Sequence, residues 1–299
     1  MTKLLFLGSG SAFTVGADNY QSNMLLIDPA QHKLLIDCGS DIRFSLHEAG
    51  FSYRDITDIY ISHLHADHVG GMEYIGLTTR FDPNCPKPNL YGSKDVLSEI
   101  WERSLSGGMR SLGNDIADLH TFFTVRKVDR HHHFSWHGLD FQLVRVIHIH
   151  NDYHLMPSYG IFFRVADLNV FITTDTQLRL EENQRYYDEA DLIFHDCETA
   201  AAPSTVHVTY EELRALPAAI RRKMWLYGYQ PGVLPDACAH GFCGFVKRGH
   251  CFEFADGQVT ATMTHPRGDR PAKATSQLPR RSNDSSESLP STALRSFEF

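Results

Sequence analysis

The amino-acid sequence predicts an α/β protein in which mixed β-sheets are covered by helices on their outer sides. Short strand-like runs recur along the chain and alternate with helical or loop segments, as is typical of that fold class. The hydrophobic fraction of 42% is that of a soluble globular protein. A chain of 299 residues is long enough to bury one large core or to divide into two domains.

The first part of the chain is expected to begin with three β-type runs separated by turn residues such as Asp28-Pro29. Next, Ile42, Leu46 and Ala49 recur with helical spacing, and Gly50 is placed to end that helix. A further strand-like run ends directly on a His-rich segment. The predicted elements are strands at 3–7, 23–28, 33–37 and 56–62, a helix at 41–49, and a loop followed by a helix near 94–104.

The second part of the chain continues the alternation up to about residue 264, and this predicts one domain over residues 1–264. From residue 265 the composition changes to Ser, Pro and interleaved charges, so residues 265–299 are predicted to be a disordered tail. The predicted strands are 141–148, 160–165, 170–174, 191–195 and 223–227, and the predicted helices are 178–189 and 210–220.

Charge and cysteine content exclude several classes of function. The net charge of −8 argues against a general nucleic-acid binder, whose affinity depends on many Lys and Arg contacts to phosphates. No apolar run approaches the roughly 20 residues of a membrane span, and the N-terminus does not resemble a secretory signal. The six scattered cysteines predict reduced thiols in a cytoplasmic protein. A zinc knuckle at Cys238 and Cys243 is the alternative, although no Cys-x-x-Cys pair is present.

The segment His63-Leu64-His65-Ala66-Asp67-His68 follows a predicted strand and places four ligand-type side chains within six residues. A turn at a strand end can direct such side chains to two sides, where they could serve two metal ions acting on one phosphoryl or carbonyl group. A chance His cluster on a surface turn is the alternative. The apolar strand before the segment and Gly70-Gly71 after it favour a metal site.

The same segment resembles the His-x-His-x-Asp-His signature of the metallo-β-lactamase fold, and its context resembles the ribonuclease Z-like and phosphodiesterase branch. Leu7-Gly8-Ser9-Gly10-Ser11-Ala12 is similar to the first glycine-rich turn of that branch, and Leu35-Ile36-Asp37-Cys38-Gly39 to its second-strand motif. The resemblance extends in order from residue 4 to about residue 250. It implies an αββα sandwich of two mixed β-sheets with helices outside.

The resemblance also implies distant metal ligands. It places one at His154, before Leu155-Met156-Pro157-Ser158-Tyr159-Gly160, with His148 and His150 on the preceding strand as competitors. It implies that Asp175 is a carboxylate bridging two ions, for which a helix N-cap is the alternative. The expected metal ligands are therefore His63, His65, Asp67, His68, His154 and Asp175. The expected ions are one or two Zn²⁺, with Mn²⁺ as an alternative.

One ligand of the family pattern has no counterpart. The last metal-binding His of the branch aligns with Gly228, which has no side chain to coordinate an ion. The second ion would then have only Asp67, His68 and the shared Asp175, together with water. This departure predicts a weaker second site and places full dinuclear activity in question.

A His and an acidic residue resemble the general acid pair of the branch. Asp196 stands where the family has Glu, and His207 follows after a short Ala-rich loop. A carboxylate that orients an imidazole keeps the pKa of the imidazole near working pH, so Asp196 and His207 are expected to act as the general acid pair. Asp67 is expected to accept the proton of the attacking water, which makes Asp67, Asp196 and His207 the expected catalytic residues. A cap or surface role for His207 is the alternative, and His195 is expected to be structural.

The resemblance therefore implies a metal-dependent hydrolase, with a phosphodiesterase for small or cyclic phosphodiester (nucleotide) substrates as the first expectation. Only 20 residues separate His154 from Asp175, so the long arm that clamps tRNA in ribonuclease Z is absent and tRNA is not expected as a substrate. The alternatives are a hydrolase of lactones, thioesters or β-lactams, and a degenerate member that binds without turnover. A homodimer is common in such folds.

A separate group of histidines is expected to lie on an exposed turn and to bind metal at most adventitiously. Its members are His131, His132, His133 and His137.

Overall fold

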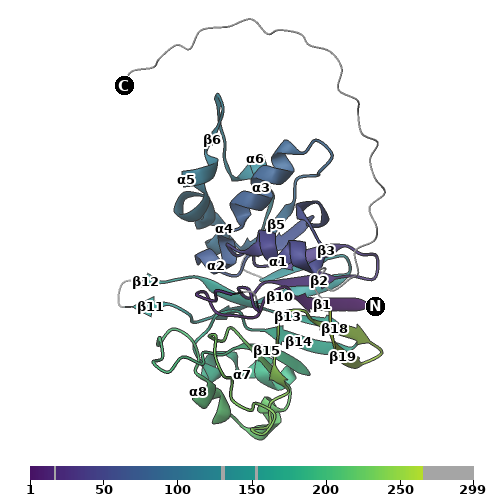
Figure 1. The fold of residues 1–299 in the computed structure, drawn as a ribbon, viewed down its shortest axis with the longest axis vertical. Coiled ribbons are helices and arrows are strands. Elements are labelled where there is room, and N and C mark those ends of the chain that lie inside the picture. Colours follow the sequence, from purple (N-terminus) through teal and green to yellow (C-terminus); the bar gives the residue numbers. More distant parts are fainter. Residues whose placement is uncertain (17, 129–131, 152–153, 265–299) are drawn as a thin grey trace, which may run out of the picture. The chain divides into compact units, whose positions relative to one another are not determined.

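The structure is a computed structural model that describes residues 1–16, 18–128, 132–151 and 154–264, with only the backbone described for residues 151 and 154. Two large mixed sheets lie face to face in the middle, with helices on both outer sides (Figure 1). The predicted tail at 265–299 lies outside the described residues. In the described ranges, none of the helices combines the length and the apolar character that a bilayer crossing requires.

The first sheet has eight strands, and its four junctions from β19 to β3 are antiparallel whereas those from β3 to β8 are parallel. Its central strand β2 is completely buried, as the continuous apolar run of that strand predicts. In spatial order the strands are β19 (Gln258–Met263), β18 (His250–Ala255), β1 (Thr2–Phe6), β2 (Met24–Ile27), β3 (Lys33–Ile36), β4 (Asp58–Tyr60), β5 (Asn89–Ser93) and β8 (Thr124–Val128).

The second sheet has seven strands, and its parallel part runs from β17 to β14. Because parallel strands end at the same edge, the loops after β14, β15 and β16 lie close together. In spatial order the strands are β17 (Gly244–Phe245), β16 (Met224–Tyr227), β15 (Leu192–Asp196), β14 (Leu168–Ile172), β13 (Ser158–Val165), β10 (Leu139–Val146) and β9 (His133–Trp136).

Helices cover the outer face of each sheet (Figure 1). The first sheet is covered by α1 (Ile42–Ala49), α2 (Ala66–Val69), α3 (Met72–Phe81), α4 (Lys94–Ile100), α5 (Ser106–Met109) and α6 (Leu119–Phe122). The second sheet carries α7 (Leu180–Glu189), α8 (Tyr210–Arg214) and α9 (Ala218–Arg221). Short turns η1 (Tyr53–Asp55) and η2 (Trp101–Leu105) and the hairpins β6 (Ser111–Leu112)–β7 (Asp115–Ile116) and β11 (His150–Asn151)–β12 (His154–Leu155) complete the fold.

Aromatic side chains fill the space between the two sheets. The ring of Phe6 from the first sheet lies 5.3 Å from that of Phe194 in the second, and Phe194 lies 4.7 Å from Phe252. The hydroxyl of Tyr60 donates to the carbonyl oxygen of Tyr159 across the same interface at 2.7 Å. All of these side chains are fully buried, so the sheets form one continuous core.

The predicted elements mostly hold, with identifiable exceptions. The helix expected at 41–49 begins at Ile42 and ends at Gly50, whose φ of 92° is the left-handed conformation of a C-cap. The helix expected at 210–220 is wrong in extent, because Pro217 cannot donate a helical hydrogen bond and the segment divides into α8 and α9. The loop expected before residue 94 instead contains β5.

Candidate metal centre and active site

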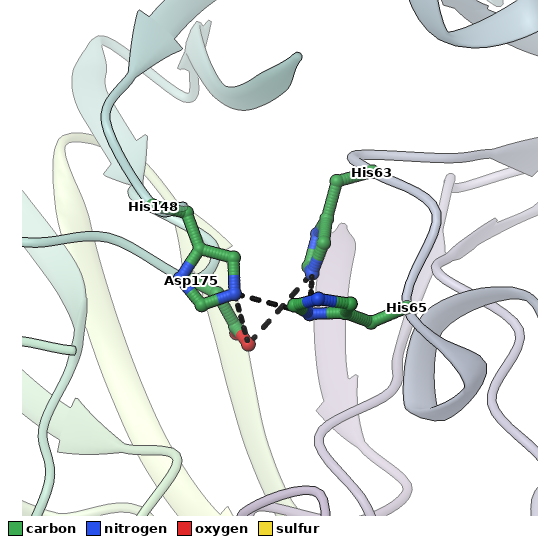
Figure 2. Close-up of side chains that lie close together, drawn as sticks. All are labelled: His63, His65, His148 and Asp175. Carbon is green, nitrogen blue, oxygen red and sulfur yellow. Dashed lines mark hydrogen bonds and ion pairs between the residues drawn. The ribbon is translucent and has the colours of Figure 1, made fainter. Parts of the chain in front are cut away.

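The candidate site lies where both sheets end and draws side chains from each (Figure 2). The His-rich segment follows β4 of the first sheet, and helix α2 starts directly after His65. His63 and His65 precede this helix, and the single turn of the helix carries Asp67 and His68. His148 follows β10, and Asp175 follows β14, of the second sheet.

Four side chains form the first possible metal-binding group: His63, His65, His148 and Asp175. The Nδ1 atom of His65 lies 3.1 Å from the Nε2 atoms of both His63 and His148. Those two Nε2 atoms each lie 3.9 Å from Oδ2 of Asp175. Donor atoms of a tetrahedral zinc site stand about 3.3 Å apart, given zinc–nitrogen distances of about 2.0–2.1 Å. The spacing therefore fits one ion of this type.

Hydrogen bonds on the outer side of the rings orient these histidines. The hydroxyl of Ser62 donates to Asp37 at 2.8 Å, so its oxygen accepts the Nδ1 hydrogen of His63 at 2.9 Å. The Nδ1 hydrogen of His148 is donated to the carbonyl oxygen of Val206 at 2.9 Å. Each ring thus turns the unprotonated Nε2 atom inward, which is the arrangement that metal-binding histidines adopt.

Asp67, His68 and Asp175 form a second group that shares Asp175 with the first. The Nε2 atom of His68 lies 3.0 Å from Oδ2 of Asp67 and 3.2 Å from Oδ2 of Asp175. On its outer side, His68 donates its Nδ1 hydrogen to Asp37 at 2.7 Å. Asp175 can therefore face two ions, as the sequence analysis expected of a bridging carboxylate.

The electrostatics of the first group suit a cation. Burial lowers the pKa of His63 well below its usual range, and burial also lowers the pKa of His65 and of His148. These rings are therefore neutral at neutral pH, which is the state that binds metal. Although burial opposes it, the interactions with His68 and His207 lower the pKa of Asp175 well below its usual range, so this carboxylate is ionised.

The fourth member of the first group differs from the residue favoured by sequence. His148, the competitor on the strand, lies with His63, His65 and Asp175, whereas the sequence analysis favoured His154. His148 is the second residue after the end of β10, and the pairing of β10 with β13 brings that strand end to the end of β14. The side chain of His154 lies outside the described residues, and its backbone belongs to the β11–β12 hairpin. Among the described side chains, His148 takes the fourth position, and a role for His154 remains a prediction.

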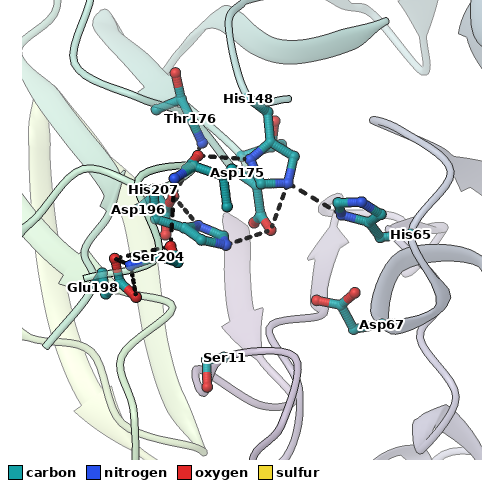
Figure 3. A network of polar contacts seen from close by, with 12 residues as sticks. Ser11, His65, Asp67, His148, Asp175, Thr176, Asp196, Glu198, Ser204 and His207 are labelled. Atoms are coloured by element: carbon teal, nitrogen blue, oxygen red, sulfur yellow. Dashed lines mark hydrogen bonds and ion pairs between the residues drawn. The ribbon is translucent and has the colours of Figure 1, made fainter. Parts of the chain in front are cut away.

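Asp196 and His207, the two residues of the expected acid pair, lie in direct contact (Figure 3). Oδ2 of the fully buried Asp196 accepts hydrogen bonds from Nδ1 of His207 at 2.7 Å and from the backbone N–H of Thr176 at 3.0 Å. The opposite nitrogen of His207, Nε2, points to Asp175 at 4.0 Å. Although burial opposes the charged ring, Asp196 raises the pKa of His207 to about 10, which is higher than the near-neutral value expected from the sequence. His207 is thus a proton donor facing the metal-binding groups.

Gly228 occupies a position where a side chain does not fit. Its φ is +77°, and a Cβ atom there would lie 2.5 Å from Oδ1 of Asp196. The backbone N–H of Gly228 donates to the carbonyl oxygen of Ser9 at 2.9 Å, which holds the loop in place. The carboxylate of Asp196 therefore occupies the space that a side chain at residue 228 would need. Asp196 thus requires glycine at this position, and glycine provides no metal ligand.

Asp37 is the main site residue to which the sequence analysis gave no role. It accepts hydrogen bonds from the backbone N–H of Ser62 at 2.8 Å, the hydroxyl of Ser62 and the ring of His68. It comes directly after strand β3 and two residues before Gly39, where a Cβ atom would lie 2.1 Å from the carbonyl oxygen of Asp67. A carboxylate at the end of a buried parallel strand was the available signal.

The assembled groups can hold one or two divalent cations, with a carboxylate between them and a proton donor at the side.

The sequence model of the family described as "Anti-Pycsar protein Apyc1" matches residues 2–252 of the chain. The chain belongs to this family. An Anti-Pycsar protein Apyc1 from Paenibacillus harenae is 33% identical over 225 residues, which cover 75% of this chain and 88% of the relative.

Solved structures agree on the fold. The metallo-β-lactamase fold protein YhfI from Bacillus subtilis superposes with a TM-score of 0.65 at 16% identity, covering 85% of this chain and all of that one. The short form of human tRNase Z gives a TM-score of 0.61 at 17% identity, covering 84% of this chain and 99% of that one. These likenesses confirm the predicted metallo-β-lactamase sandwich fold.

Proposed function

We propose that this protein is a metal-dependent phosphodiesterase that hydrolyses small cyclic nucleotides. One observation carries the proposal: His207, held by Asp196, directs its Nε2 atom toward Asp175 at 4.0 Å. Hydrolysis of an alkyl phosphodiester releases an alkoxide, which needs a proton, and a cationic imidazole beside the metal-binding groups supplies one. Membership of the family supports the cyclic nucleotide as substrate class.

The proposed cofactor is Zn²⁺, held by His63, His65, His148 and Asp175, with a second ion at Asp67, His68 and Asp175. The donor set, with three imidazoles and shared carboxylates, fits Zn²⁺, and Mn²⁺ is the alternative. When bound, such ions supply Lewis-acid chemistry to the phosphate. His154, the ligand expected from the sequence, is not part of this proposal.

The reaction follows from the positions of the protein groups. A water oxygen forms a bond to phosphorus while Asp67 accepts one of its protons. The phosphorus–oxygen bond to the ribose breaks, and His207 gives its Nε2 proton to the leaving oxygen. Asp196 remains ionised and stabilises the charged ring of His207 before the transfer. The product is a linear nucleoside monophosphate.

A small substrate fits the architecture better than tRNA. The chain between His154 and Asp175, where a tRNA-clamping arm would be inserted, is filled by β13 and β14 and the turn that joins them. The net charge of −8 also disfavours a polyanion. The expectations of a cytoplasmic location and of a homodimer remain predictions.

Gly228 supports one competing function, in which the protein binds a nucleotide without turnover. The second group offers three protein ligands, because residue 228 contributes no imidazole. Catalysis would then depend on how well the second ion is retained.

The test is a panel of 3′,5′-cyclic nucleotides with purine and pyrimidine bases, together with lactone, thioester and p-nitrophenyl phosphodiester substrates. Metal content is measured in the same preparation. The expected result is release of linear monophosphates by the wild type and much slower release by His207→Gln, with metal content unchanged. Nucleotide binding without product in the metal-loaded protein would favour the binding function, and preferential lactone or thioester cleavage would overturn the phosphodiesterase proposal.

A further inference from the structure

A second cluster of metal-ligand side chains lies apart from the candidate active site. Asp28, His32 and His137 each offer one ligand atom, and these atoms lie within 4.8 Å of one another. None of the three residues has a role in the proposed reaction. The two imidazole rings are stacked, with their centroids 3.7 Å apart and their planes 7° from parallel.

The turn between β2 and β3 fixes the carboxylate of this cluster. Oδ1 of Asp28 accepts the backbone N–H of His32 at 2.8 Å, and Oδ2 lies 2.8 Å from Nδ1 of the same residue. The backbone N–H of Asp28 also donates to the carbonyl oxygen of His32 at 3.1 Å. Although burial opposes ionisation, the hydrogen bonds from His32 lower the pKa of Asp28. Asp28 is only 5% exposed, so it presents a fixed, ionised carboxylate beneath the rings.

His137 comes from the other sheet. It lies in the turn between β9 and β10, with a φ of 43°, and Gly138 follows with a φ of 81°. Its ring meets the buried ring of Trp136 edge to face at 5.1 Å, which holds the turn against the core. The stack on His32 therefore joins a hairpin of the first sheet to a hairpin of the second.

We propose that Asp28, His32 and His137 bind a divalent ion of the Zn²⁺ class and that this ion links the two sheets outside the active site. Two imidazoles and one carboxylate are donors that Zn²⁺ takes readily, with water completing the coordination. Ligation requires one of the two exposed imidazoles to turn out of the stack, because its lone pair lies in the plane of the ring, whereas the buried carboxylate stays in place. The turn bearing His137 is thus a ligand-bearing element rather than only an exposed loop.

The decisive measurement is the number of Zn²⁺ ions bound per chain, by equilibrium dialysis of the full chain with the active-site ions present. Wild-type protein is expected to bind one more ion than His137→Phe, with an affinity for that ion at least about tenfold above any residual binding in the variant. Phenylalanine keeps a planar ring against His32 but has no donor nitrogen. His47→Ala, which removes an exposed histidine on α1 outside this cluster, is expected to retain the wild-type number.

Thermal unfolding gives a second readout that does not depend on catalysis. Adding Zn²⁺ to protein whose active-site ions are saturated is expected to raise the melting temperature of the wild type and of His47→Ala, but not of His137→Phe. Equal ion numbers and equal thermal responses in all three proteins would overturn the proposal. Because neither readout uses a substrate, failure here would leave the proposed phosphodiesterase function untouched.

Discussion

Replacing Gly228 by alanine should destabilise the protein by displacing Asp196, in addition to straining the backbone at residue 228. The added Cβ atom would lie 2.5 Å from Oδ1 of Asp196, well inside normal contact distance. This carboxylate is fully buried and is held by Thr176 and His207, so it cannot withdraw without losing charge-assisted hydrogen bonds. Gly257 is a matched control, because its φ of +70° is similar and a Cβ atom there would meet nothing within 4 Å.

The two substitutions separate two costs. Gly257→Ala should lower the free energy of unfolding by about 1–2 kcal/mol, the cost of a left-handed conformation for a residue with a Cβ atom. Gly228→Ala carries the same cost and also weakens hydrogen bonds to a charged group, which contribute about 1.5–3 kcal/mol. The difference between the variants should therefore be about 2 kcal/mol in urea unfolding. Because Asp196 orients His207, activity should fall about 100-fold in Gly228→Ala only.

The outcome that refutes this reasoning is equal destabilisation of both variants together with full activity of Gly228→Ala. It would mean that Asp196 moves aside at no cost. Gly228→His gives a further check, because the imidazole would have to enter the space of Asp196. It is expected to lower activity and to leave the number of bound ions unchanged, whereas a gained ion with restored turnover would favour a simple missing ligand.

Three further outcomes are expected. His207→Gln should slow hydrolysis of a cyclic nucleotide by about 100- to 10,000-fold. The same variant should slow hydrolysis of a p-nitrophenyl phosphodiester far less, because p-nitrophenolate leaves without a proton. Equal losses in kcat for the two substrates would contradict the proton-donor role. Burial lowers the pKa of His195 to about 4, so the native state binds fewer protons than the unfolded chain below pH 6.5. Stability should therefore fall by about 3 kcal/mol between pH 6.5 and 4, and urea unfolding of His195→Gln should lack this part of the slope. Removing divalent ions with a chelator should abolish activity and lower the melting temperature, and adding Zn²⁺ should restore both; a chelated protein with unchanged turnover would exclude metal dependence.

Local signals in the sequence were sufficient for much of the fold. Gly50 ends α1 because the left-handed conformation it adopts has no steric cost for glycine. The buried runs of β2 and β3 are apolar throughout, so they could be recognised without knowledge of their partners. Strand β5 was missed because it follows a Pro-rich stretch and contains Gly92, which weakens the local strand pattern.

The site was predictable where its residues are close in sequence and less so where they are distant. His63, His65, Asp67 and His68 could be found from their spacing alone. The choice between His148 and His154 depends on which of them the register of β10 and β13 brings to Asp175, and no local pattern encodes that register. The close approach of Asp196 to Gly228 is likewise a contact between the ends of two parallel strands, β15 and β16.

The distribution of the metal-binding groups over both sheets has a consequence for the order of assembly. His65 and His148, whose ring nitrogens lie 3.1 Å apart, are 83 residues apart in the chain. During synthesis, His63 and His65 leave the ribosome before His148 and Asp175. The N-terminal half alone therefore offers only part of this metal-binding group. The group is complete only when the second sheet has packed against the first. An ion bound by this group would therefore stabilise only the protein in which both sheets have met, by about 2.7 kcal/mol at a free ion concentration 100 times the dissociation constant.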